Sequence, residues 1–190
     1  SARVTVCTMA DQQEQWVIRI RRGDRDAFRT LFDAYYGRLC AFAVEYVGSI
    51  DRARDVVQDV FLTLWERRAD WVLHGSLTSY LYQSVRNRSL NATRNRATRR
   101  RAYQAHRERR PRVYGRTGED QAYYHQLSEA IHHAIDQLPP RRRMVFLLHR
   151  QHDLTYAEVA QTMGITRKTV ENQMGRALKF LRKRIHEDMQ

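Results

Sequence analysis

Residues 154–181 read LTYAEVAQTMGITRKTVENQMGRALKFL, and this stretch predicts two helices joined by a tight turn. Thr155 precedes a helical pattern and Glu158 follows three residues later, which is the spacing of a capping box at a helix start. Gly164 stands where the chain must turn with a positive φ, a conformation that glycine adopts without strain. Thr166 is placed to cap the second helix. The stretch is typical of a helix-turn-helix, and the alternative is a helical hairpin whose charged face is merely solvated.

The second predicted helix has an apolar face and a polar face. Its apolar side chains recur at helical spacing and are Val170, Met174, Ala177, Leu178, Leu181 and Ile185. The residues predicted to face DNA are Arg167, Lys168, Thr169, Glu171, Asn172, Gly175, Arg176 and Lys179. Most of these side chains can bond base edges or phosphates, so the segment predicts DNA binding.

The charge balance of the whole chain also points to nucleic acid. Among 190 residues, 34 Lys and Arg stand against 21 Asp and Glu, which gives a net charge of +13. Such an excess is typical of proteins that bind a polyanion, and nucleic acid is favoured over a membrane surface. Charge alone leaves a ribosomal or other RNA-binding protein equally open.

The number of cysteines and the length of the apolar segments indicate in which cellular compartment the protein resides. Cys7 and Cys40 are the only cysteines in the sequence, too few for a disulfide framework or a zinc site, and they fit a reducing cytoplasm. No apolar run in the sequence approaches the roughly 18 residues that cross a bilayer. The first residues, SARVTVCTMA, lack the basic-then-apolar order of a signal peptide. We therefore expect a cytoplasmic protein without membrane insertion.

Composition and periodicity predict an all-α fold with two small helical domains. Strand-like alternation is nearly absent, and long amphipathic patterns dominate. We place one helical domain at residues 15–95, a basic flexible linker at residues 96–122 and a second helical domain at residues 123–187. Arginines crowd residues 94–116, where Glu108 is the only acidic residue. For this segment we favour contact with a polyanion over a solvated tether.

In the first domain an apolar stripe is followed by a break and a helix with two different faces. The stripe consists of Phe28, Leu31, Phe32, Tyr35, Leu39, Phe42 and Tyr46. Gly48 and Ser49 interrupt it, and Asp51 is predicted to cap the next helix. That helix contains DVVQDVFLTLW, with an apolar face of Val56, Val57, Val60, Phe61, Leu64 and Trp65. Its other face is acidic and polar.

Five motifs in this order and spacing carry a resemblance to a known family. They are DAFRTLFDAYYGRL, DVVQDVFLTLW, SYLYQSVRNRSLN, DQLPPRRRMVFLL and the helix-turn-helix, and they extend from about Asp24 to Arg184. With them the chain resembles an extracytoplasmic-function sigma factor of the sigma-70 family. That family is the minimal class of specificity subunit of bacterial RNA polymerase.

The resemblance implies a docking helix for core polymerase. The DVVQDVF segment matches the family's helix that binds the clamp coiled coil of the largest subunit, and the matching contact positions are Asp55, Gln58, Asp59 and Phe61. An acidic patch in a basic protein suits a basic partner helix. The alternative is an ordinary solvated helix face.

The resemblance also implies a reader of the promoter −10 element, in which the non-template strand is melted and a base is flipped into the protein. The positions that match this role are Trp71, His74, Ser76, Tyr80, Arg86, Asn87 and Arg88. Aromatic rings can stack on an exposed base, hydroxyl and amide groups can bond its edge, and arginines can neutralise phosphates. The alternative for Trp71 and Tyr80 is that both are core aromatics.

By the same resemblance the helix-turn-helix reads the −35 element in the major groove. Arg176 suits guanine, Asn172 suits adenine and Glu171 suits the amino group of cytosine. Gly175 departs from the larger side chain often found there, so the DNA approaches more closely or loses a contact. The expected phosphate contacts are Arg167, Lys168 and Lys179.

The function implied is a transcription initiation factor that binds core polymerase and directs it to two-part promoters. Strand separation would follow from binding, so we expect no enzymatic activity, no cofactor and no metal site. The expected partners are the clamp helices and flap of core RNA polymerase, promoter DNA and, as in many family members, an anti-sigma factor. Two rivals are a response regulator, whose alternating strand-helix receiver pattern is missing, and a general RNA-binding protein, which leaves the acidic face unexplained.

Overall fold

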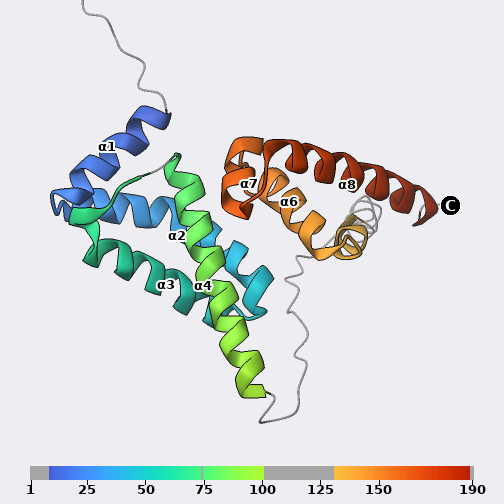
Figure 1. Cartoon of the computed structure of the whole chain (residues 1–190), viewed down its shortest axis with the longest axis horizontal. Coiled ribbons are helices and arrows are strands. Elements are labelled where there is room, and N and C mark those ends of the chain that lie inside the picture. Colours follow the sequence, from blue (N-terminus) through green and yellow to red (C-terminus); the bar gives the residue numbers. More distant parts are fainter. Residues whose placement is uncertain (1–8, 74, 101–130, 189–190) are drawn as a thin grey trace, which may run out of the picture. The chain divides into compact units, whose positions relative to one another are not determined.

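The computed structural model describes residues 9–73, 75–100 and 131–188, and within these ranges it contains helices and turns but no strand. The chain divides into two compact units, residues 1–110 and residues 111–190. Figure 1 traces the helices of each unit along the chain. The predicted all-α fold with two helical domains is confirmed.

The first unit is built around a long central helix. Its elements are α1 (Met9–Arg21), α2 (Arg25–Val47), α3 (Ile50–Glu66), the short 3-10 helix η1 (Arg68–Asp70) and α4 (Leu77–Arg100). Helix α2 packs against α1, α3 and α4, while α3 also packs against α4 (Figure 1). The core contains Ile20, Leu31, Leu39, Phe42, Val57, Leu81, Tyr82 and Val85. Most of the apolar stripe predicted for α2 therefore faces inward.

The two ends of α2 are fixed by local chemistry. The Asp24 carboxylate accepts hydrogen bonds from the backbone N–H groups of Asp26 and Ala27, both at 3.0 Å, which satisfies donors that a helix start leaves free. These bonds and the neighbouring Arg19 lower the pKa of Asp24. Gly48 ends the helix with φ of 72°.

The predicted cap at Asp51 is wrong. Helix α3 begins two residues earlier than expected, at Ile50, with Ser49 in the cap position and no side-chain cap bond. Asp51 instead lies within the first turn, where its carboxylate is 3.5 Å from Arg54. A carboxylate there still favours the helix, because it lies near the positive end of the helix dipole.

One buried hydroxyl joins three helices of the first unit. The side-chain amide of Gln13 on α1 donates to the hydroxyl oxygen of Tyr35 on α2 at 3.0 Å. The Tyr35 hydroxyl also lies 2.8 Å from the hydroxyl of Thr78 on α4. Tyr35 is only 6% exposed, so the two bonds satisfy a group that would be costly to bury alone.

The second unit packs a long C-terminal helix against shorter ones. Its described elements are a helical segment at residues 131–136, α6 (Pro140–Arg150), α7 (Tyr156–Met163) and α8 (Arg167–Asp188). Helix α8 packs against both α6 and α7 (Figure 1). One core cluster consists of Ala134, Ile135, Leu138, Leu147, Ala177 and Leu181. The first of these helices ends before Pro139, as the sequence predicts, and Pro140 is the first residue of α6.

The linker predicted at residues 96–122 lies mostly outside the described residues. Helix α4 continues to Arg100, so residues 96–100 are helical although the sequence placed them in the linker. Alanine and arginine are good helix formers, which favours this extension. The domain boundaries themselves stay a prediction.

Candidate nucleic-acid and partner interfaces

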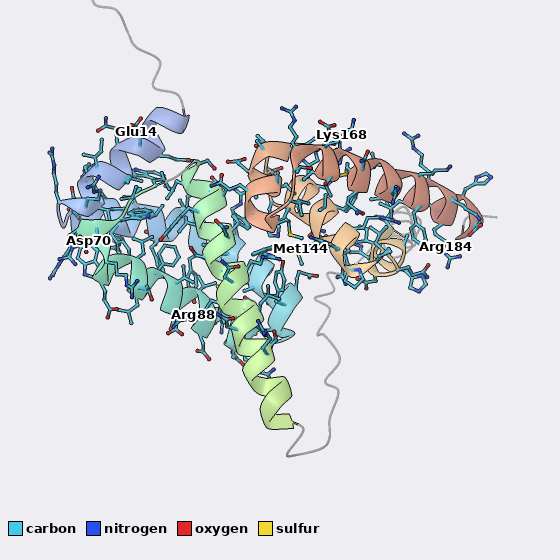
Figure 2. The ribbon with its side chains drawn as sticks, viewed as in Figure 1. Glu14, Asp70, Arg88, Met144, Lys168 and Arg184 are labelled. Atoms are coloured by element: carbon cyan, nitrogen blue, oxygen red, sulfur yellow. The ribbon has the colours of Figure 1, made fainter. Side chains whose placement is uncertain are left out.

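Three of the predicted polymerase contacts lie together on the outer side of α3. Asp55, Gln58 and Asp59 are all exposed, and their spacing of three and four residues places them on one side of the helix. The Asp59 carboxylate lies 2.8 Å from the guanidinium of Arg88 on α4. The structure therefore joins a predicted polymerase contact to a predicted −10 contact, and Figure 2 labels Arg88 on α4.

Phe61 does not belong to this surface, so the prediction of a polymerase contact there is corrected. Its side chain is 2% exposed, and its ring packs against Phe28 and Phe32, with centroid distances of 6.0 and 4.9 Å. Phe61 thus holds α3 against α2. Leu62, 56% exposed, lies seven residues after Asp55 and continues the exposed side. We call Asp55, Gln58, Asp59 and Leu62 the α3 row.

Helical spacing alone would have placed Leu62 on the exposed side of this helix, whereas the match to the family motif selected Phe61 instead. An exposed side of a helix repeats at intervals of three, four and seven residues, and Leu62 fits that series from Asp55 whereas Phe61 does not. Phe61 had also been placed on the apolar face, and the structure confirms that placement.

Trp71 is a core aromatic rather than an exposed stacking platform. It is 5% exposed, and its ring lies 5.4 Å from the Tyr80 ring at an interplanar angle of 46°. Its indole N–H has no hydrogen-bond partner within the described part of the chain. Tyr80 is half-buried, and the neighbouring Val72 is 59% exposed. The alternative given for Trp71 from the sequence is therefore confirmed, whereas Tyr80 keeps an accessible edge.

Ser76 uses its hydroxyl to begin α4. The Ser76 side-chain oxygen accepts a bond from the backbone N–H of Ser79 at 3.1 Å, and the Ser76 carbonyl accepts one from the N–H of Tyr80 at 3.1 Å. A base contact by Ser76 would therefore have to share or replace this cap. His74, the other predicted contact in the loop, lies outside the described residues.

Further along α4, the predicted contacts differ in exposure. Asn87 and Arg88 are exposed, whereas Arg86 is half-buried beside the Tyr46 phenol. Burial raises the pKa of Tyr46 to about 12, and the Arg86 guanidinium opposes part of that rise. Asn87 accepts a 3.4 Å bond from Arg86 through its side-chain carbonyl. Helix α4 thus presents an amide and two guanidinium groups beside one another.

The helix-turn-helix is formed as the sequence predicts. The Thr155 N–H donates to the Glu158 carboxylate at 2.9 Å, and the Glu158 N–H donates to the Thr155 hydroxyl at 3.3 Å, which completes the capping box. Gly164 turns the chain with φ of 63°. The Thr166 hydroxyl accepts a bond from the Thr169 N–H at 3.2 Å at the start of α8. These local bonds fix where each helix begins and ends.

Helix α8 has the two faces that its sequence predicts. Val170, Met174 and Ala177 are buried at 0, 2 and 0% exposure, so they pin the helix to its unit. Thr169 and Glu171 are half-buried. The remaining predicted DNA contacts are exposed, namely Arg167, Lys168, Asn172, Gly175, Arg176 and Lys179. In Figure 2, Lys168 is labelled at the start of α8.

Gly175 leaves an open position on this exposed face. A Cβ atom placed there would meet nothing within 4 Å, and the backbone is helical rather than left-handed. The fold therefore does not require glycine at this position.

Glu171 links two of the exposed cations. One carboxylate oxygen lies 3.4 Å from the Arg167 guanidinium, and the other lies 3.6 Å from the Lys168 ammonium. Arg176 and Lys179, further along the same face, form no ion pair with any described residue. The face therefore contains both paired and unpaired cations.

Two kinds of feature are absent from the described residues. Among them, no group of three or more His, Cys, Asp and Glu side chains is placed to hold a metal ion. No helix in the described ranges is long and apolar enough to cross a membrane.

Comparison with known proteins identifies both units. The family profile "Sigma-70 region 2" matches residues 31–100, and "Sigma-70, region 4" matches residues 128–181. The chain is 24% identical to the RNA polymerase sigma-H factor of Pseudomonas aeruginosa over 185 residues, covering 88% of this chain and 90% of that one. It is 22% identical to the ECF RNA polymerase sigma factor SigW of Bacillus subtilis over 189 residues, covering 89% and 94%. It is 27% identical to the ECF sigma factor SigK of Mycobacterium ulcerans over 173 residues, covering 86% and 88%.

Solved structures share the fold. CnrH, in complex with the cytosolic domain of CnrY, superposes with a TM-score of 0.64 at 19% identity, covering 94% of this chain and 99% of that one. The sigma factor RpoE of Bartonella quintana, in complex with the anti-sigma factor NepR, gives 0.62 at 20% identity, covering 84% and 96%. The two matching regions and the full-length relatives together show that this chain belongs to the extracytoplasmic-function class of the sigma-70 family of RNA polymerase sigma factors and acts in transcription initiation.

Proposed function

We propose that the first unit docks on core RNA polymerase through the α3 row. The observation that carries this assignment is charge separation: a chain of net charge +13 exposes Asp55 and Asp59 beside an exposed leucine on one helix. Acidic and apolar groups together suit a partner helix that presents basic and apolar side chains, and the resemblance implies that this partner is the clamp coiled coil of the largest subunit. Leu62 takes the place in this surface that the sequence assigned to Phe61.

We propose that α4 and the loop before it hold the unpaired non-template strand of the −10 element. Asn87 can bond a base edge, while Arg86 and Arg88 can neutralise phosphates. Trp71 supports the loop from within, and Tyr80 offers the partly exposed aromatic edge. Binding the single strand more tightly than the duplex shifts the melting equilibrium toward the open state.

We propose that α8 reads the −35 element in the major groove. Asn172 and Arg176 are four residues apart, about one helical turn, on the exposed face of α8, and this separation suits contacts with adjacent base pairs. Glu171 suits the cytosine amino group, and Arg167, Lys168 and Lys179 suit phosphates, which set affinity rather than sequence. Thr169, at the first turn of α8, suits a phosphate contact through its hydroxyl, which lies 2.9 Å from the Thr166 hydroxyl.

This mechanism consists of binding and strand separation. We propose no covalent step, no cofactor and no metal ion, because each function assigned above needs only hydrogen bonds, ion pairs and stacking. The second unit is further proposed to contact the polymerase flap, as the resemblance implies.

An inhibitory protein is a proposed further partner. The relatives CnrH and RpoE were solved in complex with CnrY and with the anti-sigma factor NepR. We propose that a protein of that class covers the α3 row here, because the exposed Leu62 gives an inhibitor apolar surface to bury. Such an inhibitor would compete with core polymerase.

The experiment that tests the proposed function is run-off transcription on a fragmented genomic library. Bacterial core polymerase is incubated with and without the full chain, and transcript starts are sequenced. We expect discrete starts that share two spaced upstream motifs only when the chain is present. An absence of new starts, together with no binding between chain and core, would refute the docking and promoter assignments.

A further inference from the structure

The cations of α8 that are predicted to contact DNA differ in whether they pair with a carboxylate of the same helix. Arg167 and Lys168 share the carboxylate of Glu171, with one cation at each oxygen. Their side chains are 71% and 79% exposed, whereas that of Glu171 is 38% exposed. Arg176 and Lys179 have no such partner among the described residues. Among the described residues, the cations of α8 that are predicted to contact DNA thus comprise two that are available and two that are already engaged.

A phosphate that approaches Arg167 or Lys168 must compete with the carboxylate of Glu171. Exposed pairs at helical spacing contribute only tenths of a kcal/mol each, so such competition lowers affinity modestly without preventing binding. The competition applies to any duplex, because phosphates are the same in every sequence. Base edges, unlike phosphates, differ from one sequence to another.

We propose that Glu171 contributes to the sequence specificity of DNA binding. Its ion pairs with Arg167 and Lys168 compete with phosphate binding when the DNA lacks the matching base pair. At the matching base pair the cytosine amino group donates to the Glu171 carboxylate, so the two cations turn to phosphates without leaving that carboxylate unpaired. Where a base pair places no amino group within reach of the carboxylate, Glu171 keeps its cations. This inference rests on the proposed −35 role of α8 and adds a negative contribution to it.

The same helix contains a matched control. Near its C-terminal end, Glu187 pairs with Lys183 at 3.7 Å and with Arg184 at 3.1 Å, which repeats the arrangement of one acid shared by cations three and four residues before it. Glu187 lies outside the predicted DNA contacts. Glu187→Gln therefore makes the same change in net charge, on the same helix, away from the groove.

The test measures binding of the full chain to two short duplexes, one of random sequence and one with the −35 motif found by run-off sequencing. Three variants are compared with the unmodified chain across about 50 to 200 mM salt. Two are the single variants Glu171→Gln and Glu187→Gln, and the third is a triple variant that combines Glu171→Gln with Arg167→Gln and Lys168→Gln. We expect Glu171→Gln to tighten binding to the random duplex about threefold to fivefold. We also expect its salt slope to steepen by up to about 1.8, since each phosphate contact adds about 0.9.

Three outcomes decide the inference. The expected result is that Glu171→Gln tightens binding to the random duplex more than Glu187→Gln does, and that the triple variant shows no such tightening. The Glu171→Gln variant should also prefer the −35 duplex less strongly than the unmodified chain does. If the two single variants tighten binding to the random duplex equally, the change in net charge alone explains the effect, and the proposal is overturned. Weaker −35 binding with no change on the random duplex would make Glu171 a base contact alone and would also overturn it. A failure of the −35 role itself is seen separately, as no preference of the unmodified chain for the −35 duplex.

Discussion

At the scale of single residues, Phe61 and Leu62 separate stability from partner binding. Phe61→Ala should lower the free energy of unfolding by about 3–5 kcal/mol, because a buried ring leaves a cavity. Leu62→Asn should change that free energy by less than about 0.5 kcal/mol. It should nevertheless weaken core polymerase binding about fivefold to thirtyfold, since an exposed leucine loses its apolar burial in the complex. Urea unfolding and a core-binding titration measure the two effects.

Ile50 provides the control for that prediction. It is 44% exposed on the same helix but lies on a different side from the α3 row. Ile50→Asn should leave core binding unchanged. Equal losses from Ile50→Asn and Leu62→Asn would argue against a specific surface at the α3 row.

Tyr46 gives a second residue-scale prediction, in alkaline solution. Its phenol stays neutral in the folded chain until pH about 12, whereas an unfolded tyrosine ionises near pH 10. The unfolded state therefore gains stability as the pH rises from about 10 to 12, and the folded chain loses up to about 2–3 kcal/mol relative to Tyr46→Phe. Below pH 10, Tyr46→Phe should be neutral or slightly stabilising, because the hydroxyl has no well-aligned hydrogen-bond partner among the described residues.

Urea unfolding of both proteins at several pH values measures this difference. A constant difference in stability between pH 9 and about pH 12 would contradict the prediction. Because the comparison is between two proteins at each pH, the titration of other groups cancels.

At the scale of elements, two glycines inside helices make a matched pair. At both Gly37 in α2 and Gly175 in α8, the position that an alanine methyl would take has no neighbouring atom within 4 Å, and neither glycine has a positive φ. Each change to alanine should therefore raise the free energy of unfolding by about 0.5–1 kcal/mol through the higher helix propensity of alanine. Urea unfolding checks both variants.

The same pair distinguishes fold from function. Only Gly175→Ala should alter binding to the −35 duplex, because only Gly175 lies on the predicted DNA-facing side of its helix. A change in −35 binding caused by Gly37→Ala would count against the assignment of that face.

Local chemistry explains which elements could be predicted from sequence. The capping box at Thr155 and the turn at Gly164 are set by bonds between residues a few positions apart, so their spacing is visible in the chain. The predicted cap at Asp51 is wrong because helix α3 starts two residues earlier than the strongest capping side chain suggests. Ser76 could be read as a base contact because a hydroxyl serves a cap and a base equally well, and only the structure shows which bond it makes.

Tertiary contacts explain what the sequence left open. The ion pair between Asp59 and Arg88 joins residues on two helices, and no spacing within either helix predicts it. The burial of Trp71 depends in the same way on how its loop packs against α4. Contacts between helices, unlike helix ends, therefore could not be predicted from spacing along the chain.

At the scale of the whole molecule, the α3 row and the predicted −35 contacts lie in different units, so docking through the α3 row can be separated from −35 recognition. Asp55→Asn, in the first unit, should weaken core binding and so reduce transcription from every promoter by a similar factor, with affinity for bare DNA nearly unchanged. Arg176→Ala, in the second unit, should leave core binding intact and cost about 1–3 kcal/mol at promoters whose −35 element places a guanine opposite it.

Run-off transcription from a mixture of promoters, with each variant, measures the pattern. Uniform loss in the first variant and promoter-dependent loss in the second are expected. Promoter-dependent loss from Asp55→Asn would contradict this division between the units.

The open position at Gly175 also bears on how such a factor can diverge. After gene duplication, one copy can acquire a side chain at that position without disturbing the packing of α8. Selection then acts on the set of promoters that the new side chain favours, with no compensating change needed elsewhere in the helix. A single codon thereby gives descendants of this gene a direct route to a new regulon.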